Sequence, residues 1–356
     1  MPVQTIHAAN ALTRLASFDA IIDARTEDEH ALDHVPGAIN WPTLNNQERI
    51  DIGTMYKQVN AFEAKKRGAA LAARNIAAHI ERHVIELPRD WKPLVYCWRG
   101  GNRSGSLATI LGAIGFQVTL IEGGYKAWRA ELVKDLDTLP SRLHYRVVCG
   151  PTGSGKTRLL HALSQQGAQV LDLEALACHR SSVLGHVPGQ AQPSQKRFDS
   201  LIWSSLRAMD PARVIYVECE SKKVGNLRVP DALINAMRAS PCIDVRLPDE
   251  ARVALLLEDY AYFVEDRLHF IERLRALTDI RGKAVVDHWS QAVLNGQIAA
   301  VVHELLHDHY DPMYRQSIDR NFVQSPKAQV FESKTHNAEA FEQMAKTILA
   351  TAAGIS

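Results

Sequence analysis

The sequence predicts an α/β protein made of two parallel-sheet domains and a helical extension. Short apolar segments that resemble strands alternate with longer segments in which apolar residues recur at helical spacing, which is typical of a parallel sheet. A polar stretch around Pro140 interrupts this alternation, which then starts again, and after Asp249 only the helical pattern remains. We therefore expect one domain over residues 1–138, a second over 143–248, and a helical extension over 249–356 that packs on the second domain.

The expected elements follow from the spacing of apolar residues and from glycine and proline breaks. In the first domain we expect strands over 18–24, 93–97 and 117–121, and helices over 59–82 and 103–115, with a third helix ending near 132. In the second domain we expect strands over 143–149, 169–173, 212–219 and 242–247, and helices over 156–165, 195–208 and 230–239.

Composition restricts the class of protein. The chain has 356 residues, 46% of them hydrophobic and 23% charged, so it is too apolar to be disordered. Lys and Arg number 41 against 40 Asp and Glu, so a nucleic-acid site would have to be a local basic patch. Five cysteines are too few for a disulfide scaffold, and we find no signal peptide and no apolar run of membrane-spanning length. We expect a cytoplasmic protein that does not bind membranes.

A cysteine followed by a glycine-rich turn stands where a strand of the first domain ends. Residues 96–104 read YCWRGGNRS, and a helix is expected to follow. Backbone N–H groups of such a loop and of the helix N-terminus can converge on one anion, while Arg99 and Arg103 add positive charge. These surroundings favour a nucleophilic thiolate. We interpret Cys97, Arg99 and Arg103 as catalytic residues; the alternative is that Cys97 is a small buried core residue.

Three ordered segments resemble the rhodanese family of sulfurtransferases. They are the loop 97–103, an amino-terminal signature made of DAR at 23–25 followed by HVPGAIN at 34–40, and a carboxy-terminal signature made of GGY at 123–125 with Trp128. The resemblance implies a rhodanese-like fold for the first domain and a persulfide, or its selenium equivalent, carried on Cys97. In this interpretation Asp23 and Arg25 hold the fold and the loop rather than take part in chemistry.

The other cysteines lack such surroundings. They are Cys149, Cys178, Cys219 and Cys242, and we interpret them as structural. No two cysteines have the CxxC spacing, so the sequence gives no support for a zinc site made of thiolates.

The second domain opens with a complete phosphate-loop motif. Residues 150–157 read GPTGSGKT, which matches G-x-x-x-x-G-K-[ST] between a strand and a helix. The expected phosphate-binding residues are Gly150, Gly153, Ser154, Gly155, Lys156 and Thr157. Lys156 would neutralise the terminal phosphates, and Thr157 makes Mg²⁺ a candidate ion. The motif indicates a polyphosphate ligand but does not distinguish ATP from a diphosphate ester.

Four carboxylates follow the ends of two strands in the second domain. They are Asp172 and Glu174 after one strand, and Glu218 and Glu220 at the end of the other. Either pair could hold a metal ion or act as a base, although solvated acidic strand ends are also common. The sequence leaves the metal unidentified.

The two domains together resemble the tRNA 2-selenouridine synthase family over essentially the whole chain. Besides the domain order, the resemblance rests on DLE at 172–174, HRSS at 179–182 and VECESKKVG at 217–225; Ser181 and Ser182 depart from the glycine expected there. It implies a transferase that converts wobble 2-thiouridine to 2-selenouridine through an S-geranylated intermediate. It also implies geranyl diphosphate and selenophosphate as co-substrates, no tightly bound cofactor, and the tRNA anticodon region as partner. An enzyme that supplies selenophosphate would be a second partner.

Other functions remain open at this stage. One is a sulfurtransferase fused to an ATP-dependent small-molecule kinase, and another is a nucleotide-gated sensor with a redox cysteine. A tRNA ligand would need a basic surface, and Trp98 could stack on a base or simply pack against the loop. The candidate basic residues, each of which could equally be a solvated charge, are Lys57, Lys65, Lys66, Arg67, Arg74, Lys222, Lys223, Arg228, Arg267, Arg273, Arg275, Arg281 and Lys283.

Overall fold

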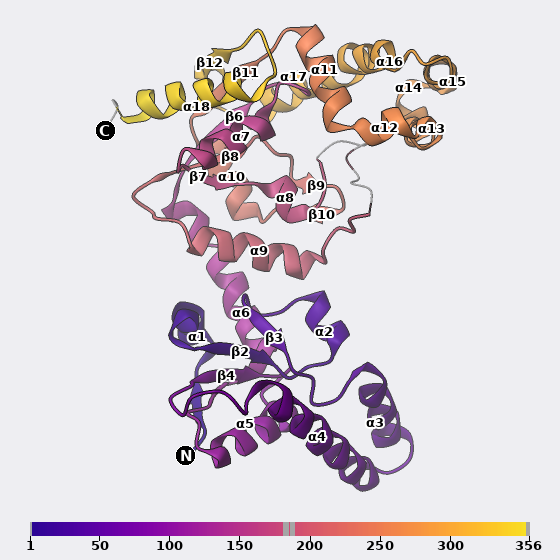
Figure 1. The fold of residues 1–356 in the computed structure, drawn as a ribbon. Coiled ribbons are helices and arrows are strands. Elements are labelled where there is room, and N and C mark those ends of the chain that lie inside the picture. The colour runs from indigo at the N-terminus through magenta and orange to yellow at the C-terminus, as the bar shows by residue number, and fades with distance from the viewer. Residues whose placement is uncertain (1, 181–184, 186–188, 354–356) are drawn as a thin grey trace. The chain divides into compact units, whose positions relative to one another are not determined.

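The protein forms two compact units, each built on a five-stranded parallel sheet (Figure 1). The structure is a computed structural model and describes residues 2–180, 185 and 189–353. The first unit contains Met1–Leu136 and Pro193–Ser204, and the second contains Asp137–Gln192 and Ser205–Ser356. The predicted α/β class, with parallel sheets and a mainly helical C-terminal part, is confirmed.

The sheet of the first unit has the strand order β1-β5-β4-β2-β3. Its strands are β1 (Gln4–Ile6), β2 (Ala20–Asp23), β3 (Ala38–Asn40), β4 (Pro93–Tyr96) and β5 (Thr119–Ile121). Its helices are α1 (Ala8–Arg14), α2 (Glu27–Leu32), α3 (Asn46–Gln58), α4 (Ala61–His83), α5 (Asn102–Ile114) and α6 (Gly124–Leu136). Buried side chains of the central strands, among them Ile22 and Val95, pack against Leu107 of α5. Because the strands are parallel, their carboxyl ends lie at one edge, where the cysteine loop begins.

Residues 193–204 depart from the predicted domain boundaries. We expected 143–248 to be one uninterrupted domain, but this stretch, which holds most of α9 (Gln195–Arg207), belongs to the first unit. The physical reason is a set of polar and aromatic contacts. Arg129 of α6 forms an ion pair with Asp199, Ser200 donates a hydrogen bond to Asp33 over 3.1 Å, and Trp203 packs on Trp128.

The sheet of the second unit has the strand order β12-β11-β6-β8-β7. Its strands are β6 (His144–Cys149), β7 (Gln169–Leu171), β8 (Val214–Glu218), β11 (Cys242–Arg246) and β12 (Gln329–Glu332). A separate antiparallel pair joins β9 (Lys223–Val224) to β10 (Leu227–Arg228). The helices of this part are α7 (Lys156–Gln165), α8 (Leu173–Ala177), α10 (Asp231–Ala239) and α18 (Ala338–Ala353).

The C-terminal region is not only a helical extension. Strand β12 pairs in parallel with β11 and forms one edge of the second sheet, so the prediction of helix alone over 249–356 is wrong at this point. Phe331 of β12 and Phe341 of α18 are buried in the same core as Val148 of β6. The last part of the chain therefore completes the phosphate-loop fold.

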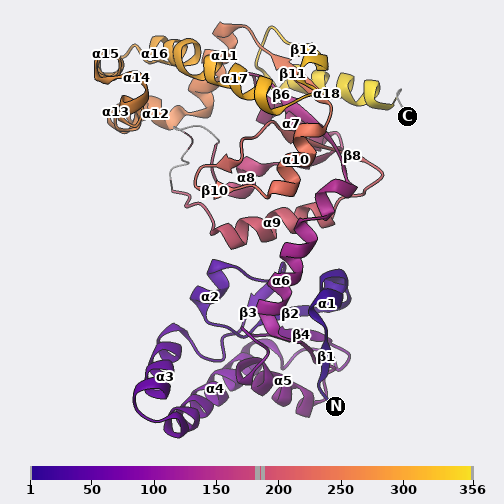
Figure 2. The ribbon, with the colours of Figure 1, turned by 180° about the vertical axis from the view of Figure 1, so that it is seen from behind.

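A helical region lies between β11 and β12 in the sequence and has its own core (Figure 2). Its elements are α11 (Asp249–Asp259), α12 (Ala261–Glu265), α13 (Arg267–Arg275), α14 (Thr278–Arg281), α15 (Lys283–Leu294), α16 (Ile298–Glu304), the π-helix η3 (Leu305–Tyr310) and α17 (Asp311–Asn321). Trp289 and Leu274 are fully buried in this core. Among the described residues, no helix is both long and apolar enough to cross a membrane.

Candidate functional site

Cys97 lies directly after β4, between that strand and the N-terminus of α5. Its side chain is 3% exposed. The Ser104 hydroxyl donates a hydrogen bond to Cys97 Sγ over 3.1 Å, and Sγ lies 3.9 Å from the Gly101 carbonyl oxygen. A hydroxyl that donates to sulfur stabilises a negative charge there. The sequence placed the cysteine correctly, but it gave no reason to expect Ser104 as its partner.

The backbone of the cysteine loop is held by the segment that follows β5. Tyr125 N–H donates to the Cys97 carbonyl over 2.8 Å, and Lys126 N–H donates to the Trp98 carbonyl over 3.0 Å. Gly124 has φ +59°, and a Cβ on it would overlap the Cys97 carbonyl oxygen and come within 2.6 Å of Gly100 N. Only glycine fits this close approach, which explains the GG sequence before Tyr125.

The two arginines of the loop have different surroundings. Arg99 is exposed, and within the described residues it has no hydrogen bond or ion pair. Arg103 instead makes a bidentate contact with Glu29, whose oxygens lie 2.5 and 3.3 Å from its guanidinium nitrogens. Burial would raise the pKa of Glu29, but the Arg103 contact outweighs it and lowers that pKa. Arg103 therefore links the loop to α2, while the charge of Arg99 is not paired within the described residues.

Asp23 and Arg25 form a buried ion pair beneath the loop, in keeping with the structural role predicted for them. Arg25 Nη2 lies 2.6 Å from Asp23 Oδ2 and also donates to the Asp33 carbonyl over 2.6 Å. Burial would raise the pKa of Asp23, but hydrogen bonds from His30 and Arg25 outweigh it and hold that pKa below its ordinary value. The guanidinium also lies 4.0 Å from the centre of the Tyr125 ring. The ion pair thus helps to fix Tyr125, whose backbone N–H donates to the Cys97 carbonyl.

Trp98 packs against neighbouring side chains, which agrees with the interpretation of Trp98 as a packing residue. Its ring is half-buried and lies 5.5 Å from the ring of Tyr125 in a nearly parallel arrangement, with Lys196 Nζ 5.9 Å from its centre. The remaining exposed part leaves base stacking open.

The phosphate loop of the second unit connects β6 to α7. Gly155 has φ +83° at the start of α7, and a Cβ there would overlap the ring of Phe341. Lys156 Nζ donates to the Gly150 and Pro151 carbonyls over 3.1 and 3.4 Å. Burial would lower the pKa of Lys156, but Cys219 and nearby carboxylates outweigh it and raise that pKa, so the side chain stays cationic. The loop therefore has the shape and charge of an anion cradle.

Three of the four predicted carboxylates come together beside this loop. Oxygens of Glu174, Glu218 and Glu220 all lie within 4.8 Å of one another. Asp172 also lines the cleft, but its Oδ1 accepts a hydrogen bond from Ala175 N–H over 2.8 Å and caps α8. Asp172 thus caps α8 as well as lining the cleft, while the three glutamates form an acidic wall of the cleft.

Glu218 has the surroundings of a metal ligand. It is 2% exposed, and its Oε1 has no hydrogen-bond partner within the described residues. Burial and the negative charge of Glu174 raise its pKa to about 8, although Lys156 and Thr157 act in the opposite direction. A buried carboxylate with an unsatisfied oxygen beside Thr157 is an oxygen-only donor set, which suits Mg²⁺. The residues therefore fit that ion.

An apolar cavity adjoins the phosphate cleft. The cleft measures about 760 Å³ and contains the phosphate loop, the three glutamates and Arg180. The cavity measures about 50 Å³ and shares Thr152, Leu256, Tyr260 and Tyr310 with the cleft. Its other lining residues are Leu257, Phe263, Val264, Phe270, Ile298, Val302, Leu305 and Leu306. The anion site therefore opens on one side into a hydrophobic pocket made by the helical region.

Comparisons with known proteins agree with this arrangement. A model of the rhodanese-like domain matches residues 7–131, and a model described as the tRNA 2-selenouridine synthase AAA domain matches residues 143–275. A tRNA 2-selenouridine synthase of Alcanivorax borkumensis is 32% identical over 84% of this chain and 90% of its own length. The chain belongs to the tRNA 2-selenouridine synthase family. The resemblance expected from the sequence is thereby confirmed.

Two further relatives carry the same name. The synthase of Bdellovibrio bacteriovorus is 30% identical, with coverage of 85% of this chain and 90% of the relative. The synthase of Nitrosomonas europaea is 35% identical, with coverage of 70% of this chain and 66% of the relative.

In this member of the tRNA 2-selenouridine synthase family, sequence reasoning missed three residues around the phosphate loop. Gly150 N–H donates to Tyr314 Oη over 2.6 Å, and Arg252 Nη2 donates to the Thr152 carbonyl over 2.8 Å. Contact with the Cys149 thiol, together with Lys156, lowers the pKa of Cys219 to about 7. Tyr314 and Arg252 lie in the region 249–356, where the sequence predicted no phosphate-binding residue. No local pattern signals them, because only the fold brings them to the loop.

The predicted basic residues of this family member differ in how far acidic neighbours compensate their charge. Lys66 pairs with Glu63 over 2.6 Å, and Arg74 pairs with Glu48 over 2.7 Å. Arg228 pairs with Asp231 over 2.8 Å. These ion pairs do not identify a tRNA-binding surface, which stays a prediction. Of the HRSS segment, Ser181 and Ser182 lie outside the described residues.

Proposed function

We propose that the protein converts wobble 2-thiouridine of tRNA to 2-selenouridine in two steps, first transferring a geranyl group to sulfur and then replacing the geranylated sulfur with selenium. Membership in the tRNA 2-selenouridine synthase family supports the overall reaction. It makes tRNA, presented by its anticodon region, the macromolecular substrate. Selenophosphate, supplied by a separate enzyme, would be the selenium donor.

The observation that carries the geranyl step is the apolar cavity beside the phosphate loop. A diphosphate with a hydrophobic chain suits the two together, because nine of the twelve residues that line the cavity are Leu, Ile, Val or Phe and only Thr152, Tyr260 and Tyr310 carry a hydroxyl group. This combination fits geranyl diphosphate better than ATP, whose adenosine needs polar recognition. The cavity is narrow, so flexible side chains such as Leu256 and Tyr310 would move apart as the chain enters.

In the first step, the sulfur of 2-thiouridine attacks the allylic C1 of geranyl diphosphate. The C1–O bond breaks, an S–C bond forms, diphosphate leaves, and the N3 proton of the base is lost. Lys156 and the loop N–H groups stabilise the negative charge that develops on the leaving diphosphate. Mg²⁺ held by Thr157 and Glu218 would add charge neutralisation.

In the second step, selenium replaces the geranylated sulfur at C2. Alkylation makes sulfur a better leaving group, so the selenium of selenophosphate adds to C2 and geranylthiol departs. Water then cleaves the Se–P bond, which releases inorganic phosphate and leaves selenium on C2. Cys97, with Ser104 at 3.1 Å from its sulfur, would position the selenium of the donor beside C2 with no change in oxidation state, and Arg99 would bind the anionic phosphate group of the donor. The sulfurtransferase–kinase alternative has the same first unit but predicts ATP in the second.

Substitution of Val302 in the apolar cavity tests the proposal. Val302→Trp narrows the cavity and should raise the KM for geranyl diphosphate about tenfold. Dimethylallyl diphosphate, which is half as long, should be used with nearly unchanged KM. The matched control is Val285→Trp, since Val285 is exposed on α15 away from the cavity. Equal effects on both diphosphates, or turnover of ATP with a small acceptor, would contradict the geranyl assignment.

A further inference from the structure

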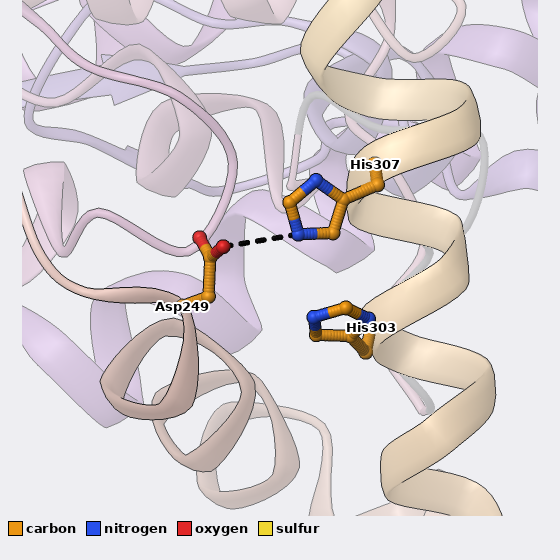
Figure 3. Close-up of side chains that lie close together, drawn as sticks. All are labelled: Asp249, His303 and His307. Atoms are coloured by element: carbon orange, nitrogen blue, oxygen red, sulfur yellow. Dashed lines mark ion pairs between the residues drawn. The ribbon is translucent and has the colours of Figure 1, made fainter.

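We propose that Asp249, His303 and His307 form a binding site for a divalent transition-metal ion of the zinc class, separate from the carboxylate cluster of the phosphate cleft. Figure 3 shows both imidazoles reaching from one side of their helix towards the aspartate. One ligand atom from each of the three side chains lies within 4.8 Å of the others. Neither the fold assignment nor the proposed reaction uses these residues.

The three side chains are arranged so that one ion can be shared. His307 Nε2 lies 3.0 Å from Asp249 Oδ2, and the ring centres of His303 and His307 are 4.5 Å apart. Ligand atoms around a tetrahedral zinc ion are separated by roughly 3.4 Å. The exposed His303 ring can close the remaining distance by side-chain rotation, because its rotamer is not fixed by burial.

The aspartate is held in place by a buried arginine. Arg252, with a side chain 5% exposed, donates from Nη1 to Asp249 Oδ1 over 3.0 Å, which leaves Oδ2 facing His307. The same guanidinium forms an ion pair with Asp311 over 2.6 Å and donates to the Thr152 carbonyl of the phosphate loop. Such outer contacts orient metal ligands and are part of built metal sites. Through Arg252, which contacts both Asp249 and the Thr152 carbonyl, the proposed metal site is connected to the phosphate loop.

The local helix geometry also singles out this position. The two histidines are four residues apart, which puts them on one face of a helix. The π-helix η3 begins between them at Leu305 and contains His307. Single π-helical turns within α-helices are frequent at functional sites.

The donor set selects the class of ion. Two imidazoles and one carboxylate suit zinc, cobalt, nickel or copper, whereas magnesium and calcium prefer oxygen ligands only. Three protein ligands leave a fourth position for water or for a ligand of the protein. The two candidate metal sites of the second unit should therefore differ in selectivity, with Mg²⁺ at Glu218 and a transition metal at Asp249.

The experiment is a titration of the purified full-length protein with Co²⁺ and Zn²⁺, without substrates. Co²⁺ should produce the visible absorption bands of a tetrahedral site at about one ion per protein, and Zn²⁺ should displace it and raise Tm. His303→Ala and His307→Ala should each weaken binding at least about tenfold. The matched controls are His288→Ala, at an exposed histidine that lies 3.7 Å from Glu304, and Glu220→Gln in the acidic cluster.

Both control variants should bind Co²⁺ like the wild type. The proposal would be overturned by wild-type affinity in the His303→Ala/His307→Ala double variant, or by loss of the Co²⁺ bands in Glu220→Gln with the histidines intact. Absence of any Co²⁺ bands in the wild type at millimolar ion would overturn it as well. Because no substrate is used, failure here would leave the proposed transferase function untouched.

Discussion

At the scale of single residues, two arginines four positions apart around one cysteine serve different purposes. Arg103 is committed to Glu29 and so joins α5 to α2, whereas Arg99 is exposed and has no described partner. Electrostatic binding of a mobile anion requires a cation that is not already neutralised. The sequence predicts the same catalytic role for both arginines. They differ in the structure because α2 places Glu29 beside Arg103.

Substitution of each arginine should therefore give a different result. Arg99→Ala should raise the KM for selenophosphate about tenfold and leave Tm unchanged, because it removes an anion contact but no packing. Arg103→Ala should lower Tm by several degrees, because Glu29 loses its partner in a partly buried position. Steady-state kinetics and calorimetry on the two variants measure this. Equal loss of stability in both would show that Arg99 is also structural.

Glu218 should make the stability of the second unit depend on pH. Its pKa is raised from 4.5 to about 8 by burial and by Glu174, so between these values the folded state binds more protons than the unfolded state. Stability contributed by this group is therefore complete below about pH 4.5 and is lost as pH rises through 8.

Removal of the Glu218 charge should accordingly stabilise the protein at high pH. Glu218→Gln should raise the free energy of unfolding by about 4 kcal/mol at pH 8, seen as a higher Tm, and by much less at pH 5. Glu265→Gln is the control, since that carboxylate is exposed. Parallel pH profiles of Tm for wild type and Glu218→Gln would contradict the raised pKa.

At the scale of elements, the sequence predicts those helices and strands that the local spacing of apolar residues and glycines determines. The strand-loop-helix units around Cys97 and Lys156 lie where the apolar runs and glycines indicated, within one or two residues for β4, α5 and α7. Strands β1 and β3 were missed, because three residues with mixed exposure have no readable period. Strand β12 was missed because its pairing with β11 joins segments about 85 residues apart, a non-local contact that no local pattern records.

The same distinction applies to the sites. Cys97 and the phosphate loop are contiguous motifs, so their residues could be predicted from the sequence. Ser104 and Tyr314 each contact these motifs through one hydroxyl group, and Arg252 does so through two guanidinium nitrogens. Their positions depend on how α5, α17 and α11 pack, and polar residues at such positions look like any solvated side chain. The apolar cavity is likewise made by several helices whose individual patterns indicate only a core.

The turn before α6 offers a direct test of how one element supports another. Gly124→Ala should destabilise the first unit by about 3 kcal/mol, because its Cβ would overlap the Cys97 carbonyl and the left-handed φ disfavours alanine. Gly37→Ala is the matched control, with φ +77° but no atom within 4 Å of its Cβ, and should cost about 1 kcal/mol. Scanning calorimetry gives both values. Equal costs would mean that the backbone approach at Gly124 is unimportant.

At the scale of the whole molecule, the two candidate sites lie on separate compact units. Cys97 and its loop belong to the first unit, and Lys156, the three glutamates and the apolar cavity belong to the second. Each unit has its own sheet and its own buried core. Such a division allows two different chemical steps to be carried by one chain and, in variants, to be lost one at a time.

The measurement that tests this division most directly is mass spectrometry of tRNA nucleosides after reaction with purified wild type, Cys97→Ser and Lys156→Ala. Each reaction contains 2-thiouridine tRNA, geranyl diphosphate and selenophosphate. Cys97→Ser should accumulate S-geranyl-2-thiouridine, because a hydroxyl cannot replace the thiolate. Lys156→Ala should leave 2-thiouridine unchanged yet convert tRNA that is already geranylated, because it lacks only the charge that stabilises diphosphate departure. If both folded variants stopped at the same nucleoside, the assignment of one step to each unit would be contradicted.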